Sequence, residues 1–231
     1  DLSVTYEKTL FSYIFRSIPY LEKEVEDKNI IDVSLICSNL ITRSESNYAF
    51  RRHVINVISS INTINFEWYG RGWKSKFNQL NNKNLKYKFS SLIQKPKINS
   101  TSFKKYKGEI KNKGFLKNVK MVLSIENHSW PNGYITEKFI EPLIYGSIPL
   151  YIGSNFSANL NEAYNEIDKI IINESNTSKI IQSILHFKDK PINECKVISK
   201  NLRDEIDRLV IDSNYKTNLM VSAKIILEKL I

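Results

Sequence analysis

The strongest constraint on the fold comes from residues 30–37, Ile-Ile-Asp-Val-Ser-Leu-Ile-Cys, which are nearly all apolar and mostly β-branched apart from Asp32 and Ser34. A run of this kind, closed by Ser38-Asn39, is typical of a strand that is buried on both faces of a parallel sheet. Apolar residues then recur at helical spacing from Phe50 to Ile61, and residues 64–68 resume the strand pattern. The sequence therefore predicts a β-α-β unit with a right-handed crossover.

The same order of strand, polar loop and helix returns in the second half of the chain. Residues 121–125 predict a buried strand, and a helix is expected to begin near Tyr134, with Thr136 as its N-cap. Pro142 predicts a kink or an early end of this helix, and Gly146 suits its C-cap. The remaining predicted elements are strands at 148–152 and 171–172 and helices at about 178–187, 197–210 and 217–230.

This alternation predicts a doubly wound α/β domain built on a parallel sheet. In such domains ligands bind in the loops at the carboxyl ends of the strands. The loops that follow the predicted strands are 38–47, 69–74, 126–134 and 153–157.

The amino-acid composition is that of a globular protein with a hydrophobic core. Hydrophobic residues make up 42% of the 231 residues, which supplies enough apolar side chains for a large core. Two cysteines, Cys37 and Cys195, exclude a disulfide framework, and a cysteine at the end of a buried strand is most often a small core residue. No apolar run approaches the ~18 residues that a membrane span requires.

The positive charge is concentrated in the segment 71–120. It holds 15 Lys/Arg residues and a single acid, Glu109, which gives it a net charge of +14, whereas the rest of the chain is at −4. A basic segment attracts polyanions such as nucleic acid, acidic lipid head groups or phosphorylated glycans. Its lysines are interspersed with Asn, Ser and Gln and lack regularly spaced aromatics, which favours a solvated insertion over a nucleic-acid surface.

Polar residues are densest between the predicted strand at 121–125 and the next helix, from Glu126-Asn127 to Glu137-Lys138. Helix N-termini bind phosphate through unpaired N–H groups. Lys138 falls in the first helical turn, where a cation is unfavourable unless an anion lies nearby. From the spacing alone, the anion is either a bound phosphate or a neighbouring surface acid.

The remaining candidate residues are two arginines, three histidines and three tryptophans. Arg51 and Arg52 stand near the start of the first crossover helix, where an arginine fork suits phosphate, although an ordinary solvated helix face has the same pattern. The three histidines lack metal-ligand spacing, and neither Gly-x-Gly-x-x-Gly nor a P-loop motif occurs. Three tryptophans near strand ends suit stacking on a sugar or base, but more often pack in a core: Trp68, Trp73 and Trp130.

Residues 126–138, Glu-Asn-His-Ser-Trp-Pro-Asn-Gly-Tyr-Ile-Thr-Glu-Lys, and then 146–153, Gly-Ser-Ile-Pro-Leu-Tyr-Ile-Gly, resemble the signature of glycosyltransferase family 10, the α-1,3/1,4-fucosyltransferases. The spacer between Asn127 and Tyr134 is one residue longer than is usual in that signature. Supporting stretches occur upstream in the same order: 34–39, Arg51 with Val54, Ile55 and Ile58, 66–72, and 106–113. The resemblance covers roughly residues 30–185.

The resemblance implies a GT-B architecture of two Rossmann-like domains, with this chain similar to the C-terminal, donor-binding half. It implies GDP-fucose as donor, a glycan hydroxyl as acceptor, inversion at the sugar carbon, and no metal or other cofactor. Arg51 and Lys138 would neutralise the pyrophosphate, where charge grows as GDP leaves. The residues that the resemblance assigns to substrate binding are Ser38, Asn39, Tyr69, Asn127, Tyr134, Thr136 and Glu137.

The same resemblance suggests how the chain is divided. Residues 1–29 look like the remnant of an N-terminal acceptor domain and linker, so the general base is expected outside this chain. Residues 30–215 form the donor-binding domain, with 71–118 as a basic insertion, and 216–231 form a C-terminal helix.

Three alternatives remain open at the level of the sequence. The chain is the donor half of a fucosyltransferase that acts on a cell-surface glycan such as lipopolysaccharide, a GT-B transferase that uses another GDP- or UDP-sugar, or a non-catalytic module that binds nucleotide-sugar or a polyanion. Expected partners are GDP-fucose and a glycan, not nucleic acid, with peripheral contact to an acidic membrane through 71–120.

Localisation is inferred from the glycosylation sequons. A sequon at Asn127 falls inside the predicted site, where a glycan would block the ligand. This favours the bacterial cytoplasm, or the inner face of the cytoplasmic membrane, over the lumen of the Golgi.

Overall fold

A computed structural model of the chain describes residues 29–39, 47–73, 97–110, 112–127, 136–153, 166–172 and 175–212, with the backbone alone for 207–212. Five strands form one sheet in the order β2-β1-β3-β4-β5, and all neighbours run parallel. The predicted α/β class with a parallel, Rossmann-like sheet is therefore confirmed.

The described elements follow the predicted alternation of strands and helices. Their bounds along the chain are β1 Ile31–Ile36, α2 Tyr48–Ser60, β2 Phe66–Tyr69, α4 Ser100–Lys104, the 3-10 helix η2 Gly114–Asn118, β3 Val119–Ile125, α5 Glu137–Ile144, β4 Ile148–Ile152, α6 Ile167–Ile170, β5 Ile171–Ile172, α7 Thr177–Lys188 and α8 Ile192–Asp212.

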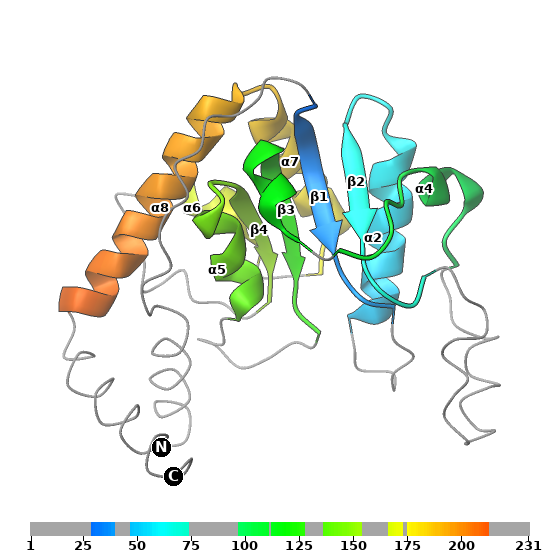
Figure 1. Cartoon of the computed structure of the whole chain (residues 1–231), viewed down its shortest axis with the longest axis horizontal. Coiled ribbons are helices and arrows are strands. Elements are labelled where there is room, and N and C mark those ends of the chain that lie inside the picture. Colours follow the sequence, from blue (N-terminus) through cyan, green and yellow to red (C-terminus); the bar gives the residue numbers. More distant parts are fainter. Residues whose placement is uncertain are drawn as a thin grey trace, which may run out of the picture.

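Helices cover both faces of the sheet (Figure 1). The helices α5 and α8 lie in front of β3 and β4, whereas α2 and α7 lie behind the sheet. The central strands β1 and β3 have neighbours on both sides and packed side chains on both faces. Strand β1 is correspondingly rich in apolar residues, with Asp32 and Ser34 as its two polar positions. Val33, Leu35 and Met121 are accordingly almost fully buried.

Helix α5 is short, as Pro142 predicts. Pro142 lies inside it and has no N–H to donate to the carbonyl of Lys138, and the helix ends two residues later, at Ile144. The hydroxyl of Ser124, on β3, donates to that carbonyl at 2.5 Å instead. Thr136 caps the helix by accepting from the Lys138 N–H at 3.2 Å, and Gly146 follows the end with φ +75°.

Some predicted boundaries differ from the structure. Helix α8 begins at Ile192, five residues before the predicted start, because Pro191 directly before it suits the beginning of a helix. Strand β2 begins at Phe66 instead of residue 64. The predicted helix at 217–230 lies outside the described residues, as do residues 1–28 and 74–96. Within the described part of the chain, no helix is both long enough and apolar enough to cross a membrane.

Candidate functional site

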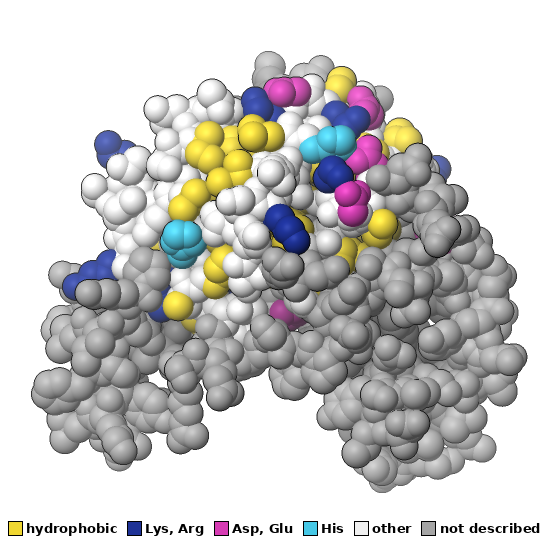
Figure 2. All heavy atoms as spheres, turned by 180° about the vertical axis from the view of Figure 1, so that it is seen from behind, with side chains coloured by type: hydrophobic (Ala, Val, Ile, Leu, Met, Phe, Trp, Pro, Cys, Tyr) yellow, Lys and Arg dark blue, Asp and Glu magenta, His cyan; other side chains and the backbone are white. Residues whose placement is uncertain are grey.

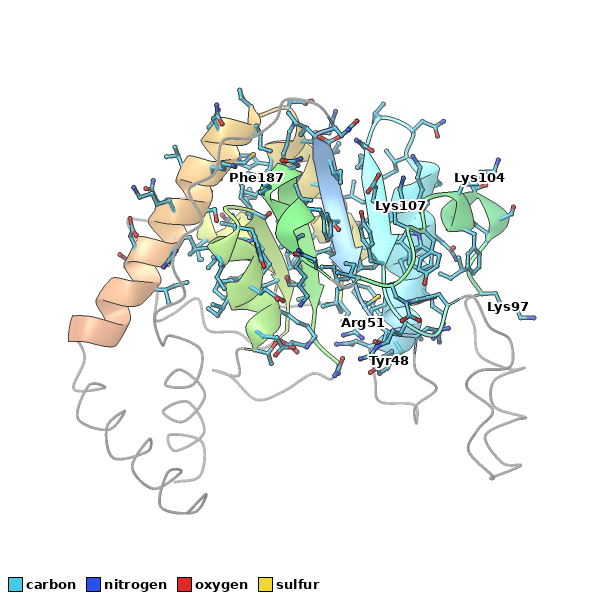
Figure 3. All side chains as sticks on the ribbon, viewed as in Figure 1. Tyr48, Arg51, Lys97, Lys104, Lys107 and Phe187 are labelled. Atoms are coloured by element: carbon cyan, nitrogen blue, oxygen red, sulfur yellow. The ribbon has the colours of Figure 1, made fainter. Side chains whose placement is uncertain are left out.

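A cavity of about 440 Å³ lies at the carboxyl ends of β1 and β3, between the first turns of α2 and α5. Figure 3 shows Tyr48 and Arg51 of α2 at this end of the sheet, the end to which the strand arrows point. The position is the one predicted for ligand binding in a doubly wound domain. Its polar and charged lining residues are Ser38, Tyr48, Arg51, Arg71, Lys113, Ser124, Asn127, Glu137, Lys138 and Glu141.

Arg51 reaches this cavity from the first turn of α2 with a side chain that is almost completely buried, at 2% exposure. One terminal nitrogen, Nη2, donates to Asn127 Oδ1 at 2.8 Å and to the carbonyl of Ile125. The guanidinium carbon lies 4.8 Å from the centre of the Tyr48 ring. Its Nε is buried and has no partner among the described residues. A buried donor of this kind is costly when unpaired, so an anion in the cavity would stabilise it.

Lys138 enters the same cavity from the first turn of α5. Its ammonium lies 3.2 Å from Glu126 Oε2 and 3.3 Å from Glu137 Oε1. Glu126 is buried at 1% exposure, whereas Glu137 is exposed. The anion that a first-turn cation requires is therefore present within the protein, and it is a buried carboxylate as well as a surface acid.

Cations outnumber carboxylates around the cavity. The described lining residues include four cations, Arg51, Arg71, Lys113 and Lys138, and two carboxylates, Glu137 and Glu141. Lys113 and Glu141 form an ion pair with each other. The surplus of positive charge suits an anionic ligand, since a cleft lined by one sign of charge concentrates its counter-ion.

The structure brings five of the predicted site residues to the cavity: Ser38, Arg51, Asn127, Glu137 and Lys138. Asn39 lies behind this lining, where its amide donates to the Gly72 carbonyl and accepts from Arg52 Nη1, both at 3.3 Å. Thr136 acts as the cap of α5 and donates to Glu126. Tyr134 lies outside the described residues.

Tyr69 lies elsewhere. Its hydroxyl donates to Glu67 Oε2 at 2.7 Å, and its ring packs on Phe115 with 4.6 Å between centroids. These residues border a second cavity of about 430 Å³. The cause is strand alternation, which turns Tyr69 away from the face that Trp68 occupies. Burial, followed by the hydrogen bond and the charge of Glu67, raises the pKa of the Tyr69 phenol.

Three lining or supporting residues were not predicted as site residues. Tyr48 precedes Arg51 by one helical turn, and that i, i+3 spacing was the available signal. Cys37 lines the cavity, and burial raises the pKa of its thiol to about 11 although Arg51 and Arg52 oppose the shift. Glu126 was noted only as part of a polar stretch, since nothing in the sequence shows that its carboxylate is buried.

Two of the three tryptophans belong to the core. Trp68 is fully buried, and its indole N–H donates to the Ser102 carbonyl at 2.9 Å. Trp73 donates to the Cys37 carbonyl at 2.8 Å and packs edge-on against Trp68 at 4.7 Å. Core packing is thus confirmed for both, and Trp130 lies outside the described residues.

The described part of the basic segment is partly neutralised by acids. Lys107 pairs with Glu67 at 3.0 Å, and Lys120 pairs with Asp32 at 3.1 Å. Figure 3 places Lys97, Lys104 and Lys107 beside α4 and β2, away from Arg51. These ion pairs reduce the net positive charge of the described part of the segment.

Histidines contribute no cluster to the described surface. Figure 2 shows the histidine side chains of the back face on either side of a group of apolar side chains, apart from each other. In the ranges that the structure describes, no three His, Cys, Asp or Glu residues are grouped so that they could hold a metal ion.

Comparison with known proteins gives one short match in sequence and several in structure. No protein-family model matches the chain. An alpha-(1,3)-fucosyltransferase B of Drosophila melanogaster is 55% identical over 40 residues, which are 17% of this chain and 9% of that protein.

Two solved structures of α1,3-fucosyltransferase, one with GDP and one with GDP-fucose, are 17% and 18% identical, with TM-scores of 0.44 and 0.42. The matches cover 84% and 83% of this chain and 48% of each solved chain, so this chain spans about half the length of those proteins. The 40-residue match confirms the resemblance to α-1,3-fucosyltransferases that the motif of residues 126–153 predicts.

Proposed function

We propose that this chain is the donor-binding half of an inverting glycosyltransferase that transfers fucose from GDP-fucose to a hydroxyl of a glycan acceptor. One observation carries the proposal. Arg51 and Lys138, which the motif assigns to the pyrophosphate, come from different helices and open onto the same cavity at the carboxyl ends of β1 and β3. The short match to an alpha-(1,3)-fucosyltransferase supports fucose as the transferred sugar.

In the proposed reaction, this chain stabilises the leaving group, GDP. The acceptor oxygen attacks the sugar carbon in line, the bond from that carbon to the β-phosphate oxygen breaks, and GDP leaves with the electron pair. The acceptor proton passes to a general base, which we place on the acceptor-binding half of the protein. Fixed cations such as Arg51 and Lys138 stabilise the negative charge that grows on the pyrophosphate.

The charge around the cavity fits this donor better than a neutral sugar. A nucleoside diphosphate sugar carries its charge on the pyrophosphate, and the four lining cations lie at one end of the sheet. An arginine offers a planar fork for phosphate oxygens, whereas a lysine offers a compact charge on a mobile stem. The pair therefore suits a group with several anionic oxygens.

Calorimetric titration of the full chain tests the proposal. We expect GDP and GDP-fucose to bind with micromolar dissociation constants, and UDP and ADP to bind at least an order of magnitude more weakly. GDP-mannose measures how far the sugar itself is recognised. Tighter binding of UDP than of GDP would indicate that the donor is a UDP-sugar instead of GDP-fucose. A folded chain that binds none of these nucleotides would contradict the proposal.

A further inference from the structure

Glu126 is a buried carboxylate that the proposed transfer does not use directly. It is the first residue after β3 and is 1% exposed. Its Oε2 accepts from the Lys138 ammonium at 3.2 Å, and its Oε1 accepts from the hydroxyls of Thr136 and Tyr151, the latter at 3.1 Å. The carboxylate is therefore surrounded by donors from α5 and β4.

The backbone of Glu126 is fixed as firmly as its side chain. Its N–H donates to the Ile152 carbonyl at 2.9 Å, and its carbonyl accepts from the Asn47 side chain at 3.1 Å. Asn47 directly precedes α2, the helix that carries Arg51. Glu126 thus connects the helix starts of Arg51 and Lys138 to the ends of β3 and β4.

A buried carboxylate is an expensive way to stabilise this region. Removing a charge from water carries a large free-energy cost that pairing repays only when the geometry is good, and apolar residues of similar volume often stabilise a fold as well or better. Another negative charge beside a cavity that receives an anion also weakens binding by repulsion. A carboxylate at this position therefore suggests a role in holding Lys138 that an apolar side chain could not fill.

We propose that Glu126 is a positioning residue for the donor site: it holds the ammonium of Lys138 at the cavity before the pyrophosphate arrives. The inference rests on the proposed function, because it takes Lys138 as the group that contacts phosphate. A lysine stem has several rotatable bonds, and ordering it on binding costs affinity. The Lys138 side chain is 24% exposed, so Glu126 holds it at the boundary between the protein interior and the cavity.

Substitution of Glu126 separates positioning from simple charge. Glu126→Gln removes the negative charge, keeps nearly the same shape, and keeps an oxygen for Thr136 and Tyr151. If Glu126 only lowers the positive charge of the site, the variant binds GDP more tightly. If Glu126 positions Lys138, the variant binds GDP more weakly, by about five- to tenfold. The two explanations therefore differ in the sign of the effect.

A double-mutant cycle with Lys138→Ala shows whether Glu126 acts through the lysine. We expect Glu126→Gln to weaken GDP binding in the parent chain and to have no further effect in the Lys138→Ala chain. Tyr151→Phe is the matched control, since it removes one hydrogen bond to the same carboxylate without touching Lys138, and it should leave GDP affinity unchanged. Glu126→Asp retains the charge but withdraws it by one methylene, and should also weaken binding.

The outcomes distinguish this inference from the proposed function. Equal or tighter GDP binding by both Glu126 variants would overturn the positioning role, as would the same loss in the Lys138→Ala background. If Lys138→Ala leaves GDP affinity unchanged, the donor site itself is misplaced. Thermal unfolding of each variant, monitored by circular dichroism, shows that the affinities belong to folded protein.

Discussion

At the scale of the residue, the two cations of the site are held in different ways. Arg51 is buried and hydrogen-bonded to a carbonyl and an amide oxygen, whereas Lys138 is held by two carboxylates. Both hydrogen bonds of Arg51 come from Nη2, whose two N–H groups reach the Ile125 carbonyl and Asn127 Oδ1. Arg51 therefore contributes to the fold as well as to the cavity.

Replacing Arg51 by lysine tests that double role. A lysine keeps the charge, but its nitrogen ends one bond short of the position of Arg51 Nη2, so it does not reach the Ile125 carbonyl and the Asn127 amide oxygen in the same way. We expect Arg51→Lys to lower the free energy of unfolding by about 1–3 kcal/mol and to weaken GDP binding. His53→Ala, on an exposed face of the same helix, should change neither quantity in denaturation and calorimetry. Unchanged stability of Arg51→Lys would contradict the buried hydrogen bonds.

The sequence predicted individual site residues only where a motif or a regular spacing identifies them. Arg51, Lys138 and Asn127 were predicted from the signature, and the structure brings them to one cavity. The side chain of Tyr69 was predicted at the same place, but the alternation of β2 turns it toward Phe115. Glu126 is buried by contacts with Thr136 and Tyr151, which belong to separate elements. A local sequence pattern does not predict such long-range contacts.

At the scale of the element, Pro142 in α5 and Ser124 in β3 act together. The proline leaves the Lys138 carbonyl without its helical donor, and the Ser124 hydroxyl supplies one. We expect Ser124→Ala to cost about 1–3 kcal/mol, because it leaves that acceptor unpaired. In a Pro142→Ala background the new N–H at 142 can serve the carbonyl, so the same substitution should cost less.

Urea denaturation of the four chains measures this coupling. The parent, both single variants and the double variant form one thermodynamic cycle. An equal cost of Ser124→Ala with and without the proline would show that the serine hydroxyl does not replace the missing donor.

The turn after β2 requires glycine at position 70. Gly70 has φ +141°, and a Cβ there would lie 1.7 Å from the Cys37 carbonyl oxygen. Gly108 also has a positive φ, +98°, but a Cβ there meets nothing within 4 Å. We expect Gly108→Ala to cost about 1–2 kcal/mol from its backbone conformation alone, and Gly70→Ala to cost clearly more. Similar losses in thermal denaturation would contradict the close approach of Gly70 to β1.

The elements themselves were largely predictable, because each has a periodic apolar pattern and a recognisable cap. Strand β4 was predicted with its observed bounds, Ile148–Ile152, and the N-cap of α5 was predicted at Thr136. The start of α8 was missed because its first turn, Ile192 to Cys195, carries a polar and acidic pair between its apolar residues. Short polar first turns give little periodic signal.

At the scale of the whole molecule, the two buried thiols link stability to pH. Burial raises the pKa values of both Cys37 and Cys195 to about 11. Between the unfolded and folded pKa values the unfolded chain loses its thiol protons while the native chain keeps them, so stability falls as pH rises from about 9 to 11. Below pH 9 the contribution is fully present. Each thiol accounts for up to about 2–3 kcal/mol of this fall.

Denaturant titrations at pH 8, 9, 10 and 11 test the linkage. Cys195→Ala loses packing at every pH, but its stability should fall less steeply than that of the parent between pH 9 and pH 11. Parallel curves for variant and parent would contradict a raised thiol pKa in the native state.

The fold of the whole molecule places a basic cavity where parallel strands end, and the sequence motif assigns the same residues to a pyrophosphate. The alternation of strands and helices was sufficient to predict the parallel sheet, whereas the order β2-β1-β3-β4-β5 follows from packing between distant segments. We propose that the cavity between α2 and α5 binds the pyrophosphate of a guanosine nucleotide.

Calorimetric titration of GDP into three chains tests that claim most directly: the parent, Lys138→Ala and Lys200→Ala. The last removes the same charge from an exposed position on α8, so it controls for net charge. We predict that Lys200→Ala binds GDP like the parent and that Lys138→Ala binds at least about tenfold more weakly, a loss of about 1.4 kcal/mol or more. Equal affinity of all three folded chains would show that GDP does not bind in the cavity that Arg51 and Lys138 line.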